Sequence, residues 1–484
     1  MHPRRLLAVL VPWLASLASC GLFLSDPAEL APVPSELLDR RFEPLELARE
    51  LDELFAVLEE VHPDLYATLS EDEVRRRRDE LVERLDRPLT RREYFPLVAE
   101  LVAALGDGHT AVYFPQEEWW RDAATRSLPF DVAWIGGELR VRRVAANLAE
   151  LEPGATLVSV AGRPASELFR AFLARHSSDS DASRVEAAER TFSLHLWTEG
   201  LVAPFDVEWR RADGSLARAT LDGVPWDALQ RGRGGAGDDG WKLARRPDGV
   251  AVLTIDTLGR PLDEFEEFLR TTFGSLHDAP ALGLVIDLRQ NGGGNSSLGD
   301  ELLQYVATKP WRQQARKEWK MSARYRDYLK GFLAAWLRWL PVQYLHPLGR
   351  KLWGAPEGEC VVLEFEHSEP RDEPLRFRGP VAFLIGPRTF SSAASLAGAV
   401  ADFKLAVLVG ATSGGSPNGF GEVLAFRLPR TQLRAQVSSA RFVRGSGDAT
   451  RRGGVEPDVA VEVPLGSTRD VVLERAVELV LGRP

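Results

Sequence analysis

Residues 282–294 read Leu-Gly-Leu-Val-Ile-Asp-Leu-Arg-Gln-Asn-Gly-Gly-Gly, an apolar run that passes into three glycines. The apolar part, 282–287, has the length and composition of a buried strand. Gly292, Gly293 and Gly294 carry no side chain, so backbone N–H groups there can approach the oxygen of a bound molecule. The stretch therefore predicts a core strand that ends at an oxyanion-binding loop.

The same pattern extends on both sides of this stretch. Strand-like runs alternate with helix-like segments, which favours an α/β arrangement; the further runs are 250–255, 381–385 and 405–409. We expect this α/β core to occupy 241–484. A glycine-rich linker at 231–240 would separate it from the preceding residues.

Two short motifs supply reactive side chains for such a loop. Residues 106–110 read Gly-Asp-Gly-His-Thr, and residues 389–394 read Thr-Phe-Ser-Ser-Ala-Ala. A serine hydroxyl is a poor nucleophile at neutral pH unless a base takes its proton, and histidine titrates in that range. We therefore expect Ser391 to be the nucleophile and His109 to be its base.

The serine motif leaves two alternatives open. Ser391 could be an ordinary helix N-cap, a common role for a serine just before a helix. Ser392 is the neighbouring candidate for the nucleophile. If Ser391 attacks, the backbone N–H of Ser392 would complete an oxyanion pocket with Gly292 or Gly293. The N-terminus of the following helix would favour the negative charge that develops there.

Together these motifs resemble the tail-specific (C-terminal-processing) serine peptidases, in particular the tricorn-like branch that uses a histidine base. The similar stretches are 106–110, 285–294, 381–410 and 454–461. The resemblance implies a crotonase-like catalytic core with an inserted PDZ-like domain in front of it. It also implies hydrolysis of peptide bonds, by an endopeptidase or carboxyl-terminal-processing action.

The chain departs from this family's pattern around the base. The family's orienting glutamate aligns with Arg451, and 412–416 holds no lysine where many relatives have their base. Asp107, Asp448 and Glu422 are the candidates for the orienting role. Because that role is open, a catalytically inactive peptide-binding lipoprotein on the same fold is the alternative function.

Two regions precede the predicted core. Residues 46–115 form a helical region, in which Thr90 and Glu93 make a capping box at the start of a helix. Residues 126–226 hold short strand-like runs, and the turn at 153–162 resembles a PDZ domain. PDZ-like folds bind an extended peptide at an open sheet edge, so we expect extended or unfolded polypeptides as substrates.

Two segments of the core have further patterns of their own. Residues 311–353 are rich in Trp, Tyr, Leu and Arg and have the composition of an insertion. They predict a helical hairpin that packs on the core, with a lid or a membrane-interface patch as the alternative. Near the C-terminus, Ser467 and Asp470 predict the start of a closing helix that runs to Leu481.

The N-terminus has the pattern of a bacterial lipoprotein signal. An apolar run at 6–17 is too short to span a bilayer and is followed by Leu-Ala-Ser-Cys, which ends at Cys20. We expect a signal peptide at 1–20, lipidation of Cys20 and a tether at 21–45. An ordinary secretory signal is the alternative. The pattern predicts a lipid-anchored protein of the bacterial cell envelope that faces the periplasm or the cell exterior.

Composition and charge limit the partners. The chain of 484 residues has a net charge of −10, which argues against nucleic acid as a partner. Its densest basic run, 75–78, is flanked by acidic residues and predicts a solvated helix face. The other histidines, His62 among them, stand in no comparable motif, and no pair has metal-ligand spacing. We therefore expect no metal and no cofactor.

Overall fold

The computed structural model describes residues 30–121, 125–144, 148, 151–231, 240–333 and 338–482. The chain divides into two compact units, each assembled from separated stretches. Unit 1 comprises Met1–Pro115, Arg316–Glu364 and Phe420–Phe442, and unit 2 comprises Gln116–Ala315, Phe365–Gly419 and Val443–Pro484. Within the described ranges, no helix is long and apolar enough to cross a membrane. Cys20, the predicted signal peptide and most of the predicted linker lie outside the described residues.

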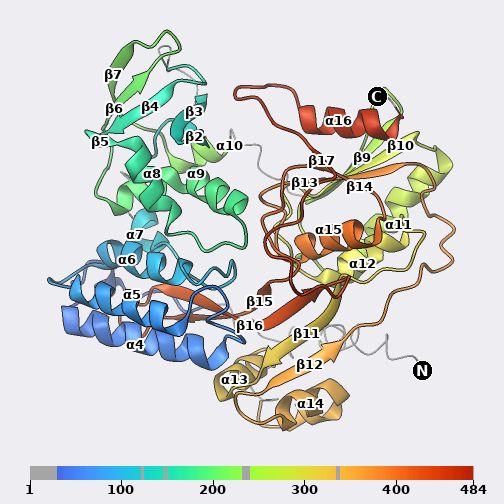
Figure 1. The fold of residues 1–484 in the computed structure, drawn as a ribbon, viewed down its shortest axis with the longest axis horizontal. Coiled ribbons are helices and arrows are strands. Elements are labelled where there is room, and N and C mark those ends of the chain that lie inside the picture. The colour runs from blue at the N-terminus through green and yellow to red at the C-terminus, as the bar shows by residue number, and fades with distance from the viewer. Residues whose placement is uncertain are drawn as a thin grey trace. The chain divides into compact units, whose positions relative to one another are not determined.

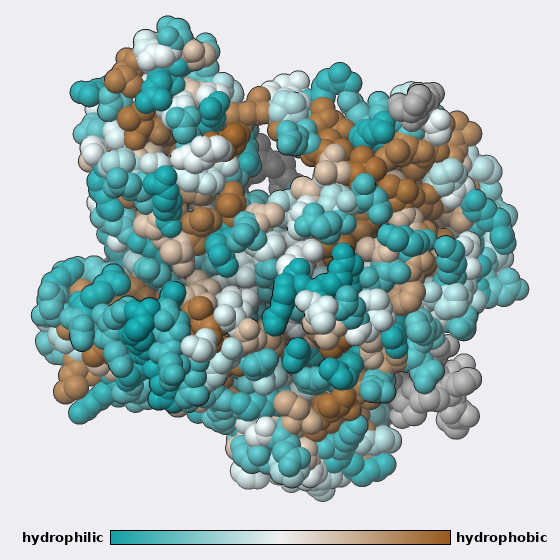
Figure 2. All heavy atoms as spheres, in the orientation of Figure 1, coloured by the Kyte–Doolittle hydropathy of each residue, from teal (hydrophilic) through white to brown (hydrophobic). Residues whose placement is uncertain are grey.

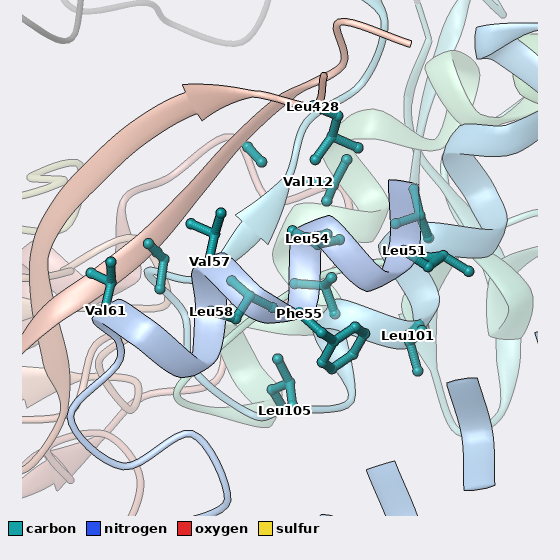
Figure 3. Close-up of a cluster of buried hydrophobic side chains, with 14 of the residues drawn as sticks. Leu51, Leu54, Phe55, Val57, Leu58, Val61, Leu101, Leu105, Val112 and Leu428 are labelled. Carbon is teal, nitrogen blue, oxygen red and sulfur yellow. The ribbon is translucent and has the colours of Figure 1, made fainter. Parts of the chain in front are cut away.

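Unit 1 begins with helices that pack around an apolar core (Figure 1). They are α3 (Ser35–Leu38), α4 (Pro44–Val61), α5 (Glu71–Glu83) and α6 (Arg91–Ala103). Leu51, Leu54, Leu58 and Val61 recur every three or four residues along α4, so they share one helix face and are buried there. Figure 3 shows this face against residues of other elements, Leu101, Val112 and Leu428 among them.

The starts of α4 and α6 depend on capping. Thr90 and Glu93 form the predicted capping box at α6, each side chain accepting from the other residue's backbone N–H.

The second half of the predicted tether is folded, contrary to expectation. Phe42 is fully buried and exchanges two backbone hydrogen bonds with Leu89, and Glu43 caps α4 directly after it.

The arginine run at 75–78 lies on α5, as predicted. Arg75 pairs with Glu71, and Arg76 pairs with Glu73 and Glu80. Hydrophilic residues cover this helix in Figure 2. These exposed pairs lie three or four residues apart on the helix, and solvent screening leaves them little effect on stability.

A sheet completes unit 1. Its order is β1-β16-β11-β12, with β15 also paired to β16. The strands are β1 (Ala111–Val112), β11 (Gln314–Lys320), β12 (Cys360–Glu364), β15 (Phe420–Arg427) and β16 (Arg434–Arg444).

The predicted helical hairpin at 311–353 is wrong at its start. There the chain forms β11, which pairs antiparallel with β12 in a register that places Trp319 opposite Val361. The partner strand lies about forty residues further along the chain, so the local pattern does not show it. Helix α13 (Ala323–Gly331), the 3-10 turn η1 (Val342–Leu345) and helix α14 (Pro347–Gly354) connect the two strands.

Unit 2 contains a first sheet, in the order β2-β3-β4-β6-β7 with β5 paired to β4. The strands are β2 (Phe130–Ile135), β3 (Glu138–Val144), β4 (Thr156–Val160), β5 (Arg163–Pro164), β6 (Phe205–Arg210) and β7 (Leu216–Leu221). Helices α7 (Gln116–Arg121) and α10 (Trp226–Arg231) flank this stretch in the chain, and α8 (Ala165–Leu173) and α9 (Asp181–Thr198) lie within it. Phe169 and Phe172 of α8 and Phe192 of α9 are buried, and they form one apolar core with residues of this sheet.

The second sheet of unit 2 carries the glycine motif (Figure 1). Its order is β17-β14-β13-β10-β9-β8, parallel except for β8. The strands are β8 (Trp241–Arg245), β9 (Val250–Ile255), β10 (Gly283–Asp287), β13 (Val381–Ile385), β14 (Val407–Gly410) and β17 (Val459–Ala460). The predicted strands at 250–255 and 381–385 match β9 and β13, so the core is mixed α/β as predicted.

Helices cover both faces of this sheet. Alternate residues of a strand point to opposite faces, and apolar residues on both faces must be covered. Leu284 and Ile286 of β10 pack with α11 (Leu262–Asp278), α12 (Ser296–Gln304) and α15 (Ser392–Phe403). Val285 packs with α16 (Val471–Val480) on the other face. Helix α16 starts later than predicted, because Asp470 caps it by accepting from Leu473 N–H, whereas the hydroxyl of Ser467 donates to Arg469 O.

Candidate active site

The serine loop and the glycine loop meet at one edge of the parallel sheet. Strands β10 and β13 are neighbours, so the loops after their carboxyl ends lie side by side. Phe390 N–H donates to Asn291 O (2.9 Å), and the Thr389 hydroxyl donates to Leu288 O (2.9 Å). A Cβ added to Gly293 would lie 2.6 Å from the Cβ of Ser391. The fold therefore brings the predicted nucleophile against the predicted oxyanion loop.

Ser391 has a strained backbone and does not cap a helix. Its φ is +52° and its ψ is −125°, although it occupies the N-cap position of α15. Its side chain makes no capping hydrogen bond, and no described residue of unit 2 hydrogen-bonds its hydroxyl. A positive φ at a residue other than glycine costs about 1–3 kcal/mol and is typical of functional sites. The N-cap alternative therefore does not account for this serine.

Ser392 differs from Ser391 in the use of its hydroxyl. The Oγ of Ser392 donates to Gly294 O at 2.6 Å, so its proton is engaged within the loop. Ser392 is also the first residue of α15, where backbone N–H groups have no partner inside the helix. These contacts favour Ser391 as the nucleophile and Ser392 as a backbone donor.

The backbone N–H groups predicted as oxyanion donors differ in whether they already make a hydrogen bond. Gly293 N–H donates to the Oδ1 of buried Asn291 at 2.9 Å and thereby closes the loop. Asn291 is held in turn by Ile255 O, which accepts from its Nδ2 at 2.8 Å. Among the described residues of unit 2, the N–H groups of Gly292 and Ser392 have no acceptor. The N–H of Gly293 therefore positions the loop, whereas the N–H groups of Gly292 and Ser392 are available as donors to a bound oxygen.

A third loop supports Ser391 from behind. Gly414 and Gly415 donate their N–H groups to Thr389 O, at 2.9 and 3.1 Å. A Cβ on Gly415 would lie 2.7 Å from the backbone nitrogen of Ser391, so the two segments are in direct contact. This is the segment where many relatives have a lysine.

The start of α9 holds this supporting loop. The Ser180 hydroxyl caps α9 by accepting from Ser183 N–H, and its oxygen also lies 3.1 Å from both Ser413 O and Gly414 O. The carboxylate of Asp179 accepts from Ser416 N–H at 3.2 Å. No motif marks these residues in the sequence apart from the N-cap pattern of Ser180.

In unit 1, Asp107 fixes the main chain around His109. Its buried carboxylate accepts the backbone N–H of His109 at 2.8 Å. It also accepts from the hydroxyls of Thr110 (2.5 Å) and Ser438 (2.6 Å). On the other side, Gln436 Nε2 donates to His109 O at 2.9 Å. The backbone of the predicted base is therefore held from two directions.

His62 is a further partner of Asp107, although the sequence showed no motif around it. The side chain of His62 is buried, and its Nε2 lies 3.2 Å from Asp107 Oδ2. Its Nδ1 accepts from Asp64 N–H at 3.1 Å, so its Nε2 carries the proton that points to Asp107. Burial alone would raise the pKa of Asp107, but the hydrogen bonds from His62 and Ser438 help to hold it well below its usual value.

The other two candidates for the orienting role have their carboxylates engaged by near neighbours. Glu422 lies in unit 1, where Lys317 Nζ and Trp319 Nε1 donate to its carboxylate. Asp448 lies in unit 2 and is exposed, and its Oδ1 accepts from the N–H (3.0 Å) and the hydroxyl (2.6 Å) of Thr450. These hydrogen bonds lower the pKa of Asp448. Of the three, only Asp107 is bonded to His109 itself.

The chain is similar to a known protein family and to solved structures. Residues 249–461 match the family model of Peptidase family S41. Among solved structures, mature CPAF is similar with a TM-score of 0.63 and 16% identity, over 90% of this chain and 97% of that chain. Mature CPAF complexed with lactacystin gives a TM-score of 0.61 and 17% identity over the same shares. At these identities the likeness shows the fold. No curated protein matches the sequence.

The matched residues include β9, β10, β13 and β14, the glycine loop and Ser391. Three of the four stretches that carried the resemblance in the sequence lie within the match, so the predicted family is confirmed there, whereas 106–110 lies outside it. Residues 249–461 of this chain form a Peptidase family S41 domain.

Proposed function

We propose that this protein is a serine peptidase in which Ser391 is the nucleophile and His109 is the base. The observation that carries the proposal is the turn at Ser391, where φ is +52° and the hydroxyl has no hydrogen bond to the described residues of unit 2. A strained turn that projects a serine at the start of a helix is the geometry of a catalytic nucleophile. The Peptidase family S41 domain supports this assignment.

The proposed chemistry is acyl transfer through a serine ester. His109 takes the proton of the Ser391 hydroxyl as the oxygen attacks the peptide carbonyl carbon. The N–H groups of Gly292 and Ser392 stabilise the oxyanion, helped by the positive end of α15. The amine then leaves with the proton from His109. Water, deprotonated by the same imidazole, hydrolyses the ester and restores Ser391.

Asp107 has a positioning role in this proposal. Its carboxylate bonds the backbone N–H of His109, so it fixes the loop that carries the imidazole. A well-placed general base contributes about 10²–10⁴-fold to the rate, and this contribution depends on its position.

We further propose that the substrates are extended or unfolded polypeptides. The strand-rich part of unit 2 has β2 and β7 at the two ends of its strand order, where an added peptide strand can pair. We interpret this part as PDZ-like and the second sheet as a crotonase-like core. We also retain the lipid anchor at Cys20 and the cell-envelope location as proposals from the sequence.

Labelling by a serine-reactive fluorophosphonate tests the chemistry without a known substrate. The wild-type protein should be labelled at Ser391, as read by mass spectrometry of its peptides. Ser391→Ala should abolish labelling, and His109→Ala should slow it by about 10²–10⁴-fold. Ser392→Ala serves as the matched control and should retain labelling at Ser391. Labelling of Ser392, or full reactivity of His109→Ala, would refute the assignment, and an unreactive wild-type protein would favour the peptide-binding lipoprotein.

Two further measurements address substrate and location. A peptide library digested by the protein should be cleaved within extended peptides, and the cleavage sites are read by mass spectrometry. Dependence on a free carboxyl terminus would indicate carboxyl-terminal processing, whereas indifference to it would indicate a general endopeptidase. Cys20→Ser should release the protein from the membrane fraction of cells at high salt, where charge-dependent binding is screened, if Cys20 is lipidated.

A further inference from the structure

The connection between β11 and β12 exposes large apolar side chains. Trp339 is 90% exposed, Leu345 is 68% exposed, and Leu340 and Tyr344 are 48% and 44% exposed. All four lie within seven positions of one another in the chain. Isolated exposed apolar residues are common, but a cluster of this kind marks a surface that binds something apolar. We call the described residues from 338 to 351 the 338–351 surface.

This surface is basic within an acidic chain. Residues 328–356 contain no Asp or Glu, although the whole chain has 70 acidic residues and a net charge of −10. The exposed basic residues are Arg338, Arg350 and Lys351. Arg350 donates to Tyr344 O (3.0 Å) and Lys351 donates to Val362 O (2.6 Å), which are neutral acceptors that leave the positive charges in place.

Buried residues and backbone hydrogen bonds fix the chain segment that carries the 338–351 surface. Leu352 is buried in the core of unit 1, and a Cβ on Gly349 would lie 1.9 Å from Gln343 O, so η1 and α14 are closely packed. The backbones of Met321 and Glu359 are hydrogen-bonded at 2.9 Å where the connection begins and ends. In Figure 2, hydrophobic residues also gather over α14. The exposed apolar side chains are therefore attached to a segment that is itself well packed.

We propose that the 338–351 surface binds the anionic headgroup layer of a phospholipid bilayer. Trp339 and Leu345 would enter the interfacial region, where aromatic and apolar side chains are stabilised, and Arg350 and Lys351 would lie among the anionic headgroups. The charge favours this occupant over a second copy of the chain, because a symmetric pair would bring like charges together. The proposal does not depend on the peptidase chemistry or on lipidation of Cys20.

Sedimentation with vesicles tests the proposal. The protein to use begins at residue 21, which removes the apolar run of the predicted signal and keeps every described residue. It should sediment with vesicles of phosphatidylcholine and phosphatidylglycerol, and much less with phosphatidylcholine alone. Arg350→Gln with Lys351→Gln should weaken binding roughly 30-fold at low salt, since each basic residue near an anionic surface contributes about five- to tenfold.

The apolar contribution has a matched control. Trp339→Ser with Leu345→Ser should weaken vesicle binding at least tenfold. Trp120→Ser with Leu216→Ser makes the same changes at exposed positions of unit 2, both 56% exposed, and should leave binding unchanged. Unfolding midpoints of the variants check that each is folded. Equal binding to neutral vesicles, or equal losses in the two double variants, would refute the proposal. So would an oligomer that forms without vesicles and is lost in the Trp339 and Leu345 variant.

Discussion

Substitution of alanine at two adjacent glycines should separate the role of the loop's shape from that of its hydrogen bonds. Gly293 has a φ of +104°, and an added Cβ would lie 2.6 Å from Ser391 Cβ, 2.9 Å from Phe390 O and 3.0 Å from Ser392 N. An added Cβ on Gly292 would have no heavy atom within 4 Å. The added methyl group of Gly293→Ala therefore overlaps the turn at Ser391. Gly292→Ala is the control, because it adds the same methyl group without overlap.

The magnitude follows from these distances. Ordinary van der Waals contact begins at 3.4 Å, so Ser391 and the new methyl group must separate by roughly a further 0.8 Å. A misplacement of about 1 Å costs about 10²-fold in rate, and displacement of the Ser392 N–H, a proposed oxyanion donor that lies 3.0 Å from the new Cβ, costs about 10²–10³-fold. Gly293→Ala should therefore slow fluorophosphonate labelling by about 10²–10³-fold. The positive φ and the overlap should also lower the free energy of unfolding by about 2–5 kcal/mol.

The assay is the rate of labelling at Ser391, combined with denaturant unfolding to show the folded fraction. Gly292→Ala should change the free energy of unfolding by less than about 0.5 kcal/mol and the labelling rate by less than about tenfold. A folded Gly293→Ala protein that is labelled at the wild-type rate would refute the inferred coupling between the glycine loop and the nucleophile.

Three further predictions concern Ser180, Asp107 and His176. Ser180→Ala removes one hydroxyl that lies against the loop behind Ser391, so it should slow labelling by about three- to tenfold, and an unchanged rate in the folded variant would show that this contact does not position the nucleophile. Asp107→Asn should lower the free energy of unfolding at pH 7 by about 2–3 kcal/mol. Because the pKa of Asp107 is depressed in the folded protein, the difference from wild type should shrink as the pH falls below about 4, whereas a constant difference would contradict the depressed pKa. Burial and the charges of Arg175 and Arg184 lower the pKa of His176 to about 4, so the unfolded chain binds its proton first and the protein should lose up to about 2 kcal/mol of stability between pH 6.5 and pH 5. His176→Gln should remove part of that loss in denaturant unfolding at the two pH values, and an equal loss in the variant would assign the effect elsewhere.

Much of the local structure of this protein could be predicted because its causes are local. The strands at 250–255 and 381–385 are short apolar runs, and they form β9 and β13 with these bounds. The capping box at Thr90 uses two side chains three residues apart, so it is visible in the sequence. The family could be predicted because the glycine and serine motifs are short and contiguous. The start of α16 was placed too early because two capping residues, Ser467 and Asp470, stand close together there.

The arrangement around the candidate site depends on residues that are far apart in the chain. His62 meets Asp107 across 45 positions, and Ser438 meets it across 331. Ser180 contacts Ser413 across 233 positions. None of these pairs leaves a local pattern, because each forms only when helices and sheets pack. For the same reason, sequence alone did not show that 314–320 is a strand, since its partner β12 lies in a different segment.

The sequence by itself determined which short segments form strands, helices and loops, and which of them hold a serine, a histidine and glycines. Spacing and side-chain chemistry act over a few residues, and they were sufficient for this. Only the tertiary structure distinguished Ser391 from Ser392, because the difference is one hydrogen bond to Gly294 and one strained turn. It also showed that Gly293 N–H is engaged by Asn291, whereas Gly292 N–H has no acceptor among the described residues of unit 2. These distinctions depend on packing against β9 and β10, where backbone groups must find partners once water is removed.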